Sequence, residues 1–284
     1  SWGCISMSVI SKLTMLGAAG SGGGPGYFFV ELPVGTSGGK ACLVNNDLYT
    51  FYRSNASGST LSYILQGKNN GTVGFQKTIN TSTNVDVRAC SANPAAGTVL
   101  LVGPAGGGSG YLTEVSSDGA EVNDTKVNSG VPVCATADST GNIYIGGTAN
   151  SRAFITKLDE DHNISWTFQF QDGGTSDGLY SVYGVKVRNS NGDVYYYARG
   201  YGINSHLWVG KLNSSGVQQW IKRISRVATG YIGETSLIGL NQSTGDVYVG
   251  SVIYGSSPSN IPTMVKMSSS GSYEWQRDLI GTSS

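Results

Sequence analysis

Residues 137–170 read ADSTGNIYIGGTANSRAFITKLDEDHNISWTFQF, and this stretch decides the fold class. A turn that ends in Gly141 and Asn142 leads into a run of β-branched and aromatic residues. A second run ends at Leu158, and the turn DEDHN leads from it into a third run around Trp166. Short runs of this kind, bounded by Gly, Asn, Asp and Ser, are typical of strands joined by tight turns. Together with the short apolar run before it, the stretch predicts four consecutive antiparallel strands.

The same turn recurs along the chain as NNDLY, AGTVL, TGNIY, NGDVY and TGDVY. A second line of similarity follows each turn, as NNGTVGF, SDGAEVN, DHNISW, SSGVQQW and SSGSYEW. The steps between turns are 51, 44, 51 and 53 residues, counted from Asp47, Thr98, Asn142, Asp193 and Asp246. Periods in this range indicate propellers, solenoids or arrays, and four strands per repeat are typical of a β-propeller blade.

The repeats predict an all-β chain, a β-propeller of four-stranded antiparallel blades with five blades visible. Residues 1–26 are expected to form an N-terminal anchor peptide and Gly-rich linker, and residues 27–284 the propeller. The segment 27–34 aligns with the outer strand of the fifth repeat, so we expect it to be a closing strand for a further blade. We therefore expect the natural protein to continue beyond residue 284 and to have six or more blades. The expected blades span approximately 38–80, 85–128, 130–172, 180–226 and 233–281.

One column of the repeat is aromatic, and we expect its side chains to pack between neighbouring blades. A large ring on an outer strand can bury roughly 150–250 Å² against the next sheet. Asn123 stands in this column in the second repeat, which predicts weaker packing there. The expected interblade residues are Phe29, Phe75, Trp166, Trp220 and Trp275.

Charge is balanced and sparse. Lys and Arg total 18, Asp and Glu total 18, and only 13% of the residues are charged. Nucleic-acid binding draws on clustered Lys and Arg, so the balance argues against a nucleic-acid partner. No apolar run reaches about 18 residues, so no membrane insertion is expected. A surface kept soluble by Ser, Thr and Asn rather than by charge suits an extracellular or assembled protein.

The sequence has no pattern typical of a catalytic or metal site. Its two histidines, His162 and His206, fall in different repeats, and nothing pairs them with a Ser or Cys nucleophile. The turn DEDHN (159–163) has the oxygen spacing of the start of a calcium loop, but Phe170 stands where that loop needs Glu. The sequence therefore predicts no enzyme, no metal and no cofactor.

Three cysteines occupy similar strand positions. Cys90 and Cys134 each stand seven residues before a turn glycine, and Cys42 lies in the matching strand of the first repeat. Val185 and Ile238 fill the corresponding position in later repeats. A position that accepts Cys, Val and Ile is typical of a small buried site, so we expect free thiols in the core.

The loops at one end of the blades vary, while those at the other end are short and regular. The second-to-third loops read GGTANSR, ARGYGINS and VIYGSSPSNIP, and the interblade connections at 171–181 and 225–236 are long. Variable loops on a rigid scaffold often carry binding residues, and Tyr and Asn suit both sugars and protein surfaces. The alternative is that these side chains merely cap the blade ends. The candidate ligand-binding residues are Tyr180, Arg199, Tyr201, Asn204, Arg226, Tyr231, Tyr254 and Asn260.

The repeat also resembles a known family. Asp or Asn before Gly-Asn/Asp, a hydrophobic residue and Tyr, followed by Lys-Leu and then by Gly and Trp, is similar to the bacterial β-propeller repeat often labelled SBBP. The resemblance covers residues 38–281 and implies the fold alone, because propellers host many functions. The N-terminal apolar peptide ending in GAAGSGGG, followed by an aromatic-rich strand and propeller repeats, resembles virion proteins of marine tailed phages. That second resemblance implies a short anchor, a glycine linker and a distal propeller.

These observations predict a non-enzymatic phage virion protein, such as a tail-fibre, knob or other peripheral component, located in the virion or outside the cell. Its N-terminal segment would contact other virion proteins, and its loop face would bind a host-surface glycan or protein. A homo-oligomer fits such a part, although no coiled-coil segment demands it. One alternative is a secreted or cell-surface bacterial propeller for adhesion or carbohydrate binding. Another is a polysaccharide-active enzyme.

Overall fold

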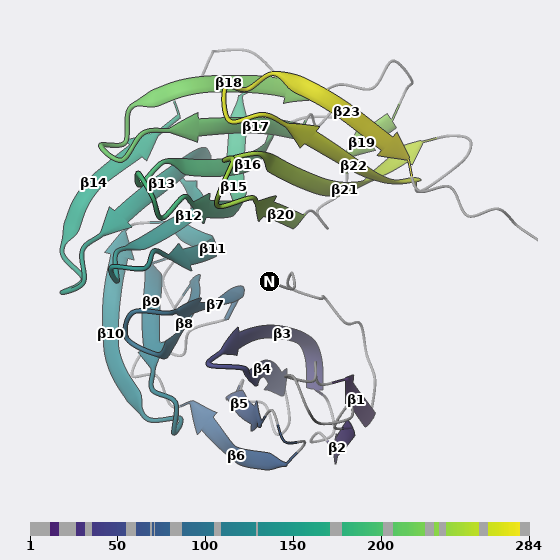
Figure 1. Ribbon diagram of the computed structural model, residues 1–284. Helices are drawn as coiled ribbons and strands as arrows, with labels where there is room; N and C mark the ends of the chain where they lie inside the picture. Colours follow the sequence, from purple (N-terminus) through teal and green to yellow (C-terminus); the bar gives the residue numbers. More distant parts are fainter. Residues whose placement is uncertain are drawn as a thin grey trace, which may run out of the picture. The chain divides into compact units, whose positions relative to one another are not determined.

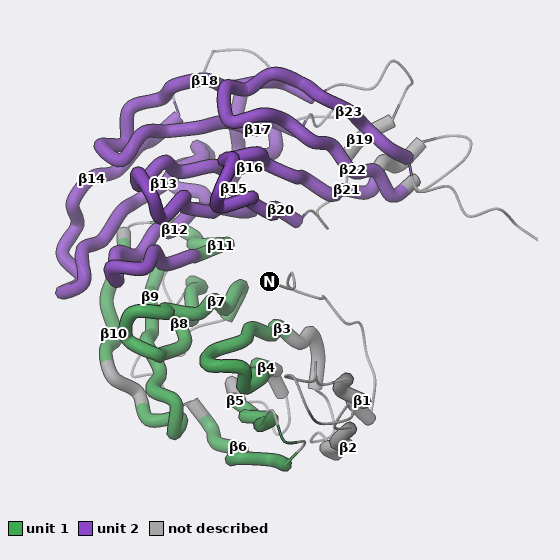
Figure 2. Tube along the Cα trace, viewed as in Figure 1, with its two compact units in different colours: residues 1–135 green, residues 136–284 purple. Residues whose placement is uncertain are grey.

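The computed structural model shows the chain as two compact units, Ser1–Ala135 and Thr136–Ser284 (Figure 2). The structure describes residues 12–16, 27–31, 36–54, 61–68, 70, 72–79, 87–104, 109–128, 130–170, 178–200, 207–224, 230–232, 237–255 and 261–278. Within these residues, no helix is long and apolar enough to cross a membrane.

The first unit begins with a two-stranded antiparallel pair. Strand β1 (Lys12–Leu16) pairs with β2 (Tyr27–Glu31), and Phe29 lies opposite Thr14. The sequence pattern does not predict β1. Strand β2 falls in the segment 27–34, whose part in a further blade stays a prediction.

Two four-stranded antiparallel sheets follow, here called blade 1 and blade 2 (Figure 1). Blade 1 consists of β3 (Thr36–Val44), β4 (Asp47–Ser54), β5 (Leu61–Gly67) and β6 (Val73–Ile79). Blade 2 consists of β7 (Ala89–Asn93), β8 (Thr98–Pro104), β9 (Gly110–Val115) and β10 (Glu121–Asn128). In both sheets each strand pairs with the next strand of the sequence.

Three more sheets complete the described chain. Blade 3 consists of β11 (Val131–Ala137), β12 (Ile143–Ala149), β13 (Arg152–Leu158) and β14 (Ile164–Gln169). Blade 4 consists of β15 (Leu179–Val187), β16 (Val194–Gly200), β17 (Leu207–Leu212) and β18 (Gln218–Ile224). Blade 5 consists of β19 (Gly230–Ile232), β20 (Leu237–Leu240), β21 (Val247–Gly255), β22 (Ile261–Met267) and β23 (Tyr273–Asp278).

Apart from the β1–β2 pair, the described strands form five consecutive antiparallel sheets, so the all-β fold of four-stranded antiparallel blades is confirmed. One segment differs from the prediction. The connection 225–236 contains strand β19, which pairs with the end of β21, while β20 pairs with its beginning. The inner strand of blade 5 is therefore split into two short strands, because β21 is long enough to pair with both.

A row of three side chains recurs in register across the blades. In blade 4, Tyr195 on β16 lies opposite Lys211 on β17, which lies opposite Trp220 on β18. The Lys211 Nζ is 5.5 Å from the centre of the Tyr195 ring, and the Tyr195 and Trp220 rings are 6.3 Å apart. Contacts of these kinds contribute roughly 0.5–1.5 kcal/mol each, so the row binds the outer three strands together. Blades 3 and 5 carry the same row as Tyr144, Lys157 and Trp166 and as Tyr248, Lys266 and Trp275.

The residue at the start of the second strand forms an ion pair or a hydrogen bond with the middle residue of this row, and its type depends on the charge of that residue. In blade 4, Asp193 forms an ion pair of 2.6 Å with Lys211. In blade 2, Glu114 takes the middle place, and both Asn93 and Thr98 donate hydrogen bonds to its Oε1. A buried charge must be paired or hydrogen-bonded, so an Asp faces the lysine whereas neutral donors face the glutamate.

The ring at the end of the row lies against a tight turn of the next blade. The Trp166 Nε1 donates a hydrogen bond of 3.0 Å to the carbonyl oxygen of Ser214. A Cβ on Gly216 would lie 2.8 Å from the Trp166 ring, and Gly216 has a φ of +79°. Both features require glycine, because other residues rarely adopt this φ and would collide with the ring. The same contact joins Trp220 with the turn at Ser269 and Gly271, and Phe75 with Gly119.

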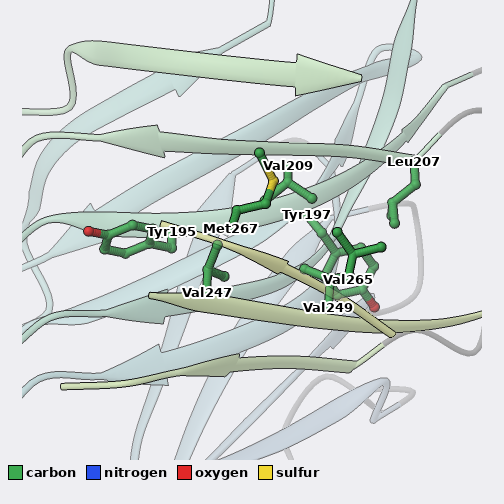
Figure 3. Close-up of a cluster of buried hydrophobic side chains, with 8 residues drawn as sticks. All are labelled: Tyr195, Tyr197, Leu207, Val209, Val247, Val249, Val265 and Met267. Carbon is green, nitrogen blue, oxygen red and sulfur yellow. The ribbon is translucent and has the colours of Figure 1, made fainter. Parts of the chain in front are cut away.

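Apolar side chains fill the space between neighbouring blades. Between blades 4 and 5 the buried cluster consists of Tyr195, Tyr197, Leu207, Val209, Val247, Val249, Val265 and Met267 (Figure 3). Between blades 1 and 2 a second cluster contains Cys90, beside Val99 and Leu101. Cys42, Cys90 and Cys134 are thiols and not part of disulfides, as the sequence predicts. Cys90 and Cys134 are buried, whereas Cys42 is half-buried.

The first turn of blade 3 is organised by one carboxylate. Asp138 is buried, and its Oδ1 accepts hydrogen bonds from the backbone N–H groups of Thr140 and Asn142, at 2.9 and 3.0 Å. Its Oδ2 accepts from the Tyr144 hydroxyl at 3.1 Å. Burial alone would raise the pKa of Asp138, but the hydrogen bonds from Asn142, Thr140 and Tyr144 outweigh it and lower the pKa.

Replacing Gly216 with Ala is expected to destabilise the protein by about 1–3 kcal/mol, because Ala is strained at this φ and its Cβ displaces the Trp166 ring. Urea denaturation measures the loss. The control is Ser215→Ala in the same turn, where the residue is exposed and little change is expected. Equal stability of the two variants would contradict the importance of the ring-to-turn contact.

Acid is expected to weaken the protein partly through Asp138. Its folded-state pKa lies below the unfolded value of about 3.9, so its contribution is present above that pH and is lost as the pH falls through the folded pKa. The free energy of unfolding of Asp138→Asn should therefore depend less steeply on pH between about 5 and 3 than that of the native chain. Denaturation at several pH values checks this, and identical slopes would show that Asp138 has no part in acid sensitivity.

Candidate functional site

Two of the predicted binding residues lie together at one end of blade 4. Tyr180 is in β15 at a shift in the strand register between Leu179 and Ser181, and Ser181 is paired with Arg199 on β16. Tyr180 and Arg199 are both half-buried. The end of blade 4 that holds Tyr180, Ser181 and Arg199 is called the loop end below.

Two further predicted residues are brought opposite each other in blade 5. Tyr231 on β19 and Tyr254 on β21 are direct register partners. The prediction assigns Tyr231 to a connection, but the short strand β19 places it beside Tyr254. The remaining predicted residues, Tyr201, Asn204, Arg226 and Asn260, lie outside the described residues.

The apolar rows between blades 4 and 5 end in polar residues at the loop end. On β16 the residues facing blade 5 are Tyr195, Tyr197 and then Arg199, which pairs with Leu207 of the buried cluster. On β21 the corresponding row runs Val247, Val249 and then Ser251. Ser251 pairs with Thr263, and Thr263 pairs with Asp278. The core between these blades therefore changes from apolar to polar toward the loop end.

Some of these polar side chains are hydrogen-bonded to one another. The Thr263 hydroxyl donates to Asp278 Oδ1 at 2.8 Å, and Gln276 Nε2 donates to the same oxygen at 3.3 Å. The Ser181 hydroxyl differs, since it is 1% exposed and has no hydrogen-bond partner. An unpartnered buried polar group is rare, because leaving it without a hydrogen bond costs about 1–3 kcal/mol.

A second unpartnered group lies on the other side of the same blade. The Trp208 Nε1 is buried without an acceptor, although the side chain as a whole is half-buried. Trp208 pairs with Ala198 and Arg223, one register step from the pair of Ser181 and Arg199. Two buried groups able to donate a hydrogen bond therefore flank the loop end of blade 4.

Sequence reasoning missed both Ser181 and Trp208. A signal for each was present in the chain. Trp208 is a tryptophan outside the aromatic column, and Ser181 is a polar residue in a strand whose neighbours are mostly apolar. Neither signal separates an unpartnered group from a partnered one, because that depends on contacts across strands.

The turn DEDHN behaves as an ordinary turn. Asp159 Oδ1 accepts hydrogen bonds from the backbone N–H groups of Asp161 and Asn163, at 3.0 and 2.7 Å. The hydrogen bond from the Asn163 backbone is the largest cause that lowers the pKa of Asp159. In the part of the chain that the structure describes, no group of three or more His, Cys, Asp or Glu is arranged to hold a metal ion.

Similar solved structures share the blade architecture. The Dos1 propeller has a TM-score of 0.56 and 11% sequence identity, over 90% of this chain and 69% of that one. An ACO/RPE65 chimera has a TM-score of 0.51 and 13% identity, over 86% of this chain and 59% of that one. Cobalt-substituted ACO from Synechocystis has a TM-score of 0.50 and 13% identity, over 86% and 59%. No protein-family model matches the chain, and no curated protein is similar to it in sequence.

These similarities establish the fold as that of β-propeller proteins and correct one expectation. ACO is an apocarotenoid oxygenase, so two of the similar structures are related to an enzyme. This finding contradicts the prediction that the chain is not an enzyme. The prediction is wrong because the lack of a recognisable triad or metal pattern in a sequence does not exclude catalysis on a fold that also serves enzymes. The chain spans 59% of the two oxygenase-related chains. At these identities the likeness concerns the fold alone.

The two hydroxyl groups near the loop end are expected to respond differently to removal. Ser181→Ala should leave the free energy of unfolding unchanged or raise it by about 1 kcal/mol, because the lost hydroxyl has no partner. Thr263→Val should lower it by about 1 kcal/mol, because Asp278 loses a donor. Urea denaturation of both variants measures the difference. Equal destabilisation would show that the Ser181 hydroxyl is satisfied in the protein.

Proposed function

We propose that this propeller is a peripheral component of a phage virion and binds a glycan on the host surface through the loop end of blade 4 and the adjoining strands of blade 5. The observation that supports binding is the pair of buried, unpartnered groups at the loop end, Ser181 Oγ and Trp208 Nε1. Such groups have hydrogen-bonding capacity that a ligand can use. Tyr180, Arg199, Tyr231 and Tyr254 stand on the same two blades.

The virion part of the proposal is supported by the N-terminal sequence. Its apolar peptide and GAAGSGGG linker, followed by an aromatic-rich strand, resemble virion proteins of marine tailed phages. In this proposal residues 1–26 contact other virion proteins, and the propeller is displayed at a distance from that contact. A protein surface on the host is the other occupant compatible with Tyr-rich and Asn-rich loops.

Replacing Tyr201 and Tyr254 with Ala is expected to abolish binding of the fluorescently labelled protein to host cells without lowering the melting temperature by much. The matched control is Tyr273→Ala, because Tyr273 is 59% exposed and begins β23, after the regular turn at the opposite end of the blade. Loss of binding in the control alone would move the site away from the loop end.

Mass spectrometry of the sample from which the sequence comes tests whether the protein is part of a phage particle. Mass spectrometry should find peptides of this chain in purified phage particles, including peptides from residues 8–20. Peptides found only in particle-free medium, starting after about residue 20, would contradict the virion proposal and indicate a processed, secreted propeller.

A further inference from the structure

We propose that Asn191 is a self-modifying residue, which reacts with the backbone nitrogen of Gly192, becomes aspartate or isoaspartate, and so adds a negative charge to blade 4. The change is covalent and lies within one chain, so it needs no ligand and does not depend on the proposed function. It follows from the Asn-Gly pair at 191–192 and from the hydrogen bonds of the turn that contains it.

The turn between β15 and β16 holds the side chain of Asn191 against the backbone that follows it. Asn191 is exposed to water. Its Oδ1 accepts a hydrogen bond of 3.1 Å from the backbone N–H of Asp193, and its Nδ2 donates one of 2.7 Å to Asp193 Oδ2. Both polar atoms of the side-chain amide are therefore fixed beside Gly192, which supplies the attacking nitrogen.

The reaction is a cyclisation followed by the addition of water. The backbone nitrogen of Gly192 attacks the Asn191 Cγ, so a new C–N bond closes a succinimide ring. The Cγ–Nδ2 bond breaks, and Nδ2 takes up the proton of the Gly192 N–H through solvent and leaves as ammonia. Water then opens the ring at either of its carbonyl carbons, which gives aspartate or isoaspartate. Water is the co-reactant, and nothing is oxidised or reduced.

Two features of the turn favour this reaction. The Asp193 N–H donates to Oδ1, the oxygen on which negative charge develops during the attack, and a donor held in place stabilises such charge. Gly192 has no side chain to shield its nitrogen. One contact opposes the reaction, because the Gly192 N–H donates to the Arg188 carbonyl oxygen at 2.8 Å. The conversion therefore proceeds when this hydrogen bond of an exposed turn opens.

Two other asparagines of the same unit serve as internal controls. Asn213 Oδ1 accepts a hydrogen bond of 3.1 Å from the backbone N–H of Ser215, and Asn241 Oδ1 accepts one of 3.0 Å from that of Ser243. Their side-chain oxygens are thus held as in Asn191, but Ser and Gln follow them in place of Gly. A side chain on the following residue hinders the approach of its backbone nitrogen, so these two asparagines should stay intact.

Conversion puts a second carboxylate beside the ion pair of blade 4. Asp193 Oδ2 lies 2.6 Å from Lys211 Nζ and also accepts the hydrogen bond from Asn191 Nδ2. The reaction removes this donor and leaves a negative charge in its place, so two like charges face each other. Isoaspartate also lengthens the backbone of the turn by one carbon atom. Both products therefore weaken the support that Asp193 gives to Lys211 over the Tyr195 ring.

Two variants test the effect on the ion pair. Asn191→Asp adds the charge that the reaction produces, whereas Asn191→Ser removes the amide without adding a charge. Asn191→Asp should have the lower melting temperature, and the difference between the two should shrink as salt rises and screens the repulsion. Equal melting temperatures would overturn the link between the modification and the stability of blade 4.

Incubation of the full chain in mildly alkaline buffer, followed by mass spectrometry of its tryptic peptides, tests the reaction itself. We expect the peptide that contains Asn191 to gain the mass difference between OH and NH2 and to separate into an aspartate and an isoaspartate form. The peptides that contain Asn213 and Asn241 should not change. Equal conversion of all three asparagines would overturn the proposal. Conversion of Asn191 in urea alone would overturn it too, because the folded turn would then protect the residue.

Discussion

The contact between an aromatic ring and a glycine turn holds neighbouring blades together, and much of the structure depends on it. The ring of Trp166 lies on the turn at Gly216, and its indole N–H reaches the carbonyl oxygen of Ser214. A turn that must accept a ring at this distance needs glycine at positive φ and has little freedom in length. The contact therefore explains why this end of the blades has short and regular turns.

Inside blades 3, 4 and 5, a cross-strand row of Tyr, Lys and Trp holds the ring in place. Tyr195, Lys211 and Trp220 are register partners, and Asp193 neutralises the lysine. The middle residue of the row and its partner at the turn differ together between blades 4 and 2. Where blade 4 has Lys211 and Asp193, blade 2 has Glu114 with the neutral donors Asn93 and Thr98. A buried charge without a partner is costly, so the strand residue and the turn residue are constrained together.

The ring contacts and short turns constrain the sequence at one end of the blades. Residues at the other end, where the variable loops lie, are less constrained. The apolar core between blades 4 and 5 gives way there to Arg199, Ser251 and Thr263. Ser181 and Trp208 leave hydrogen-bonding atoms unpartnered in the same blade. These groups are the physical basis of the proposed site. The contacts that hold the blades together lie at the other end, so the groups at this end can serve binding.

Sequence alone determined the repeat, the four strands of each blade and the aromatic column, because strand alternation and glycine turns are local patterns with a fixed period. The candidate residues were found only partly, since Tyr180 and Arg199 do adjoin on paired strands while Ser181 and Trp208 went unnoticed. Only the tertiary structure decided that Tyr231 pairs with Tyr254 and that Ser181 Oγ and Trp208 Nε1 are buried without hydrogen-bond partners. Pairing across strands and the partnering of buried atoms depend on residues far apart in the chain, which no local pattern specifies.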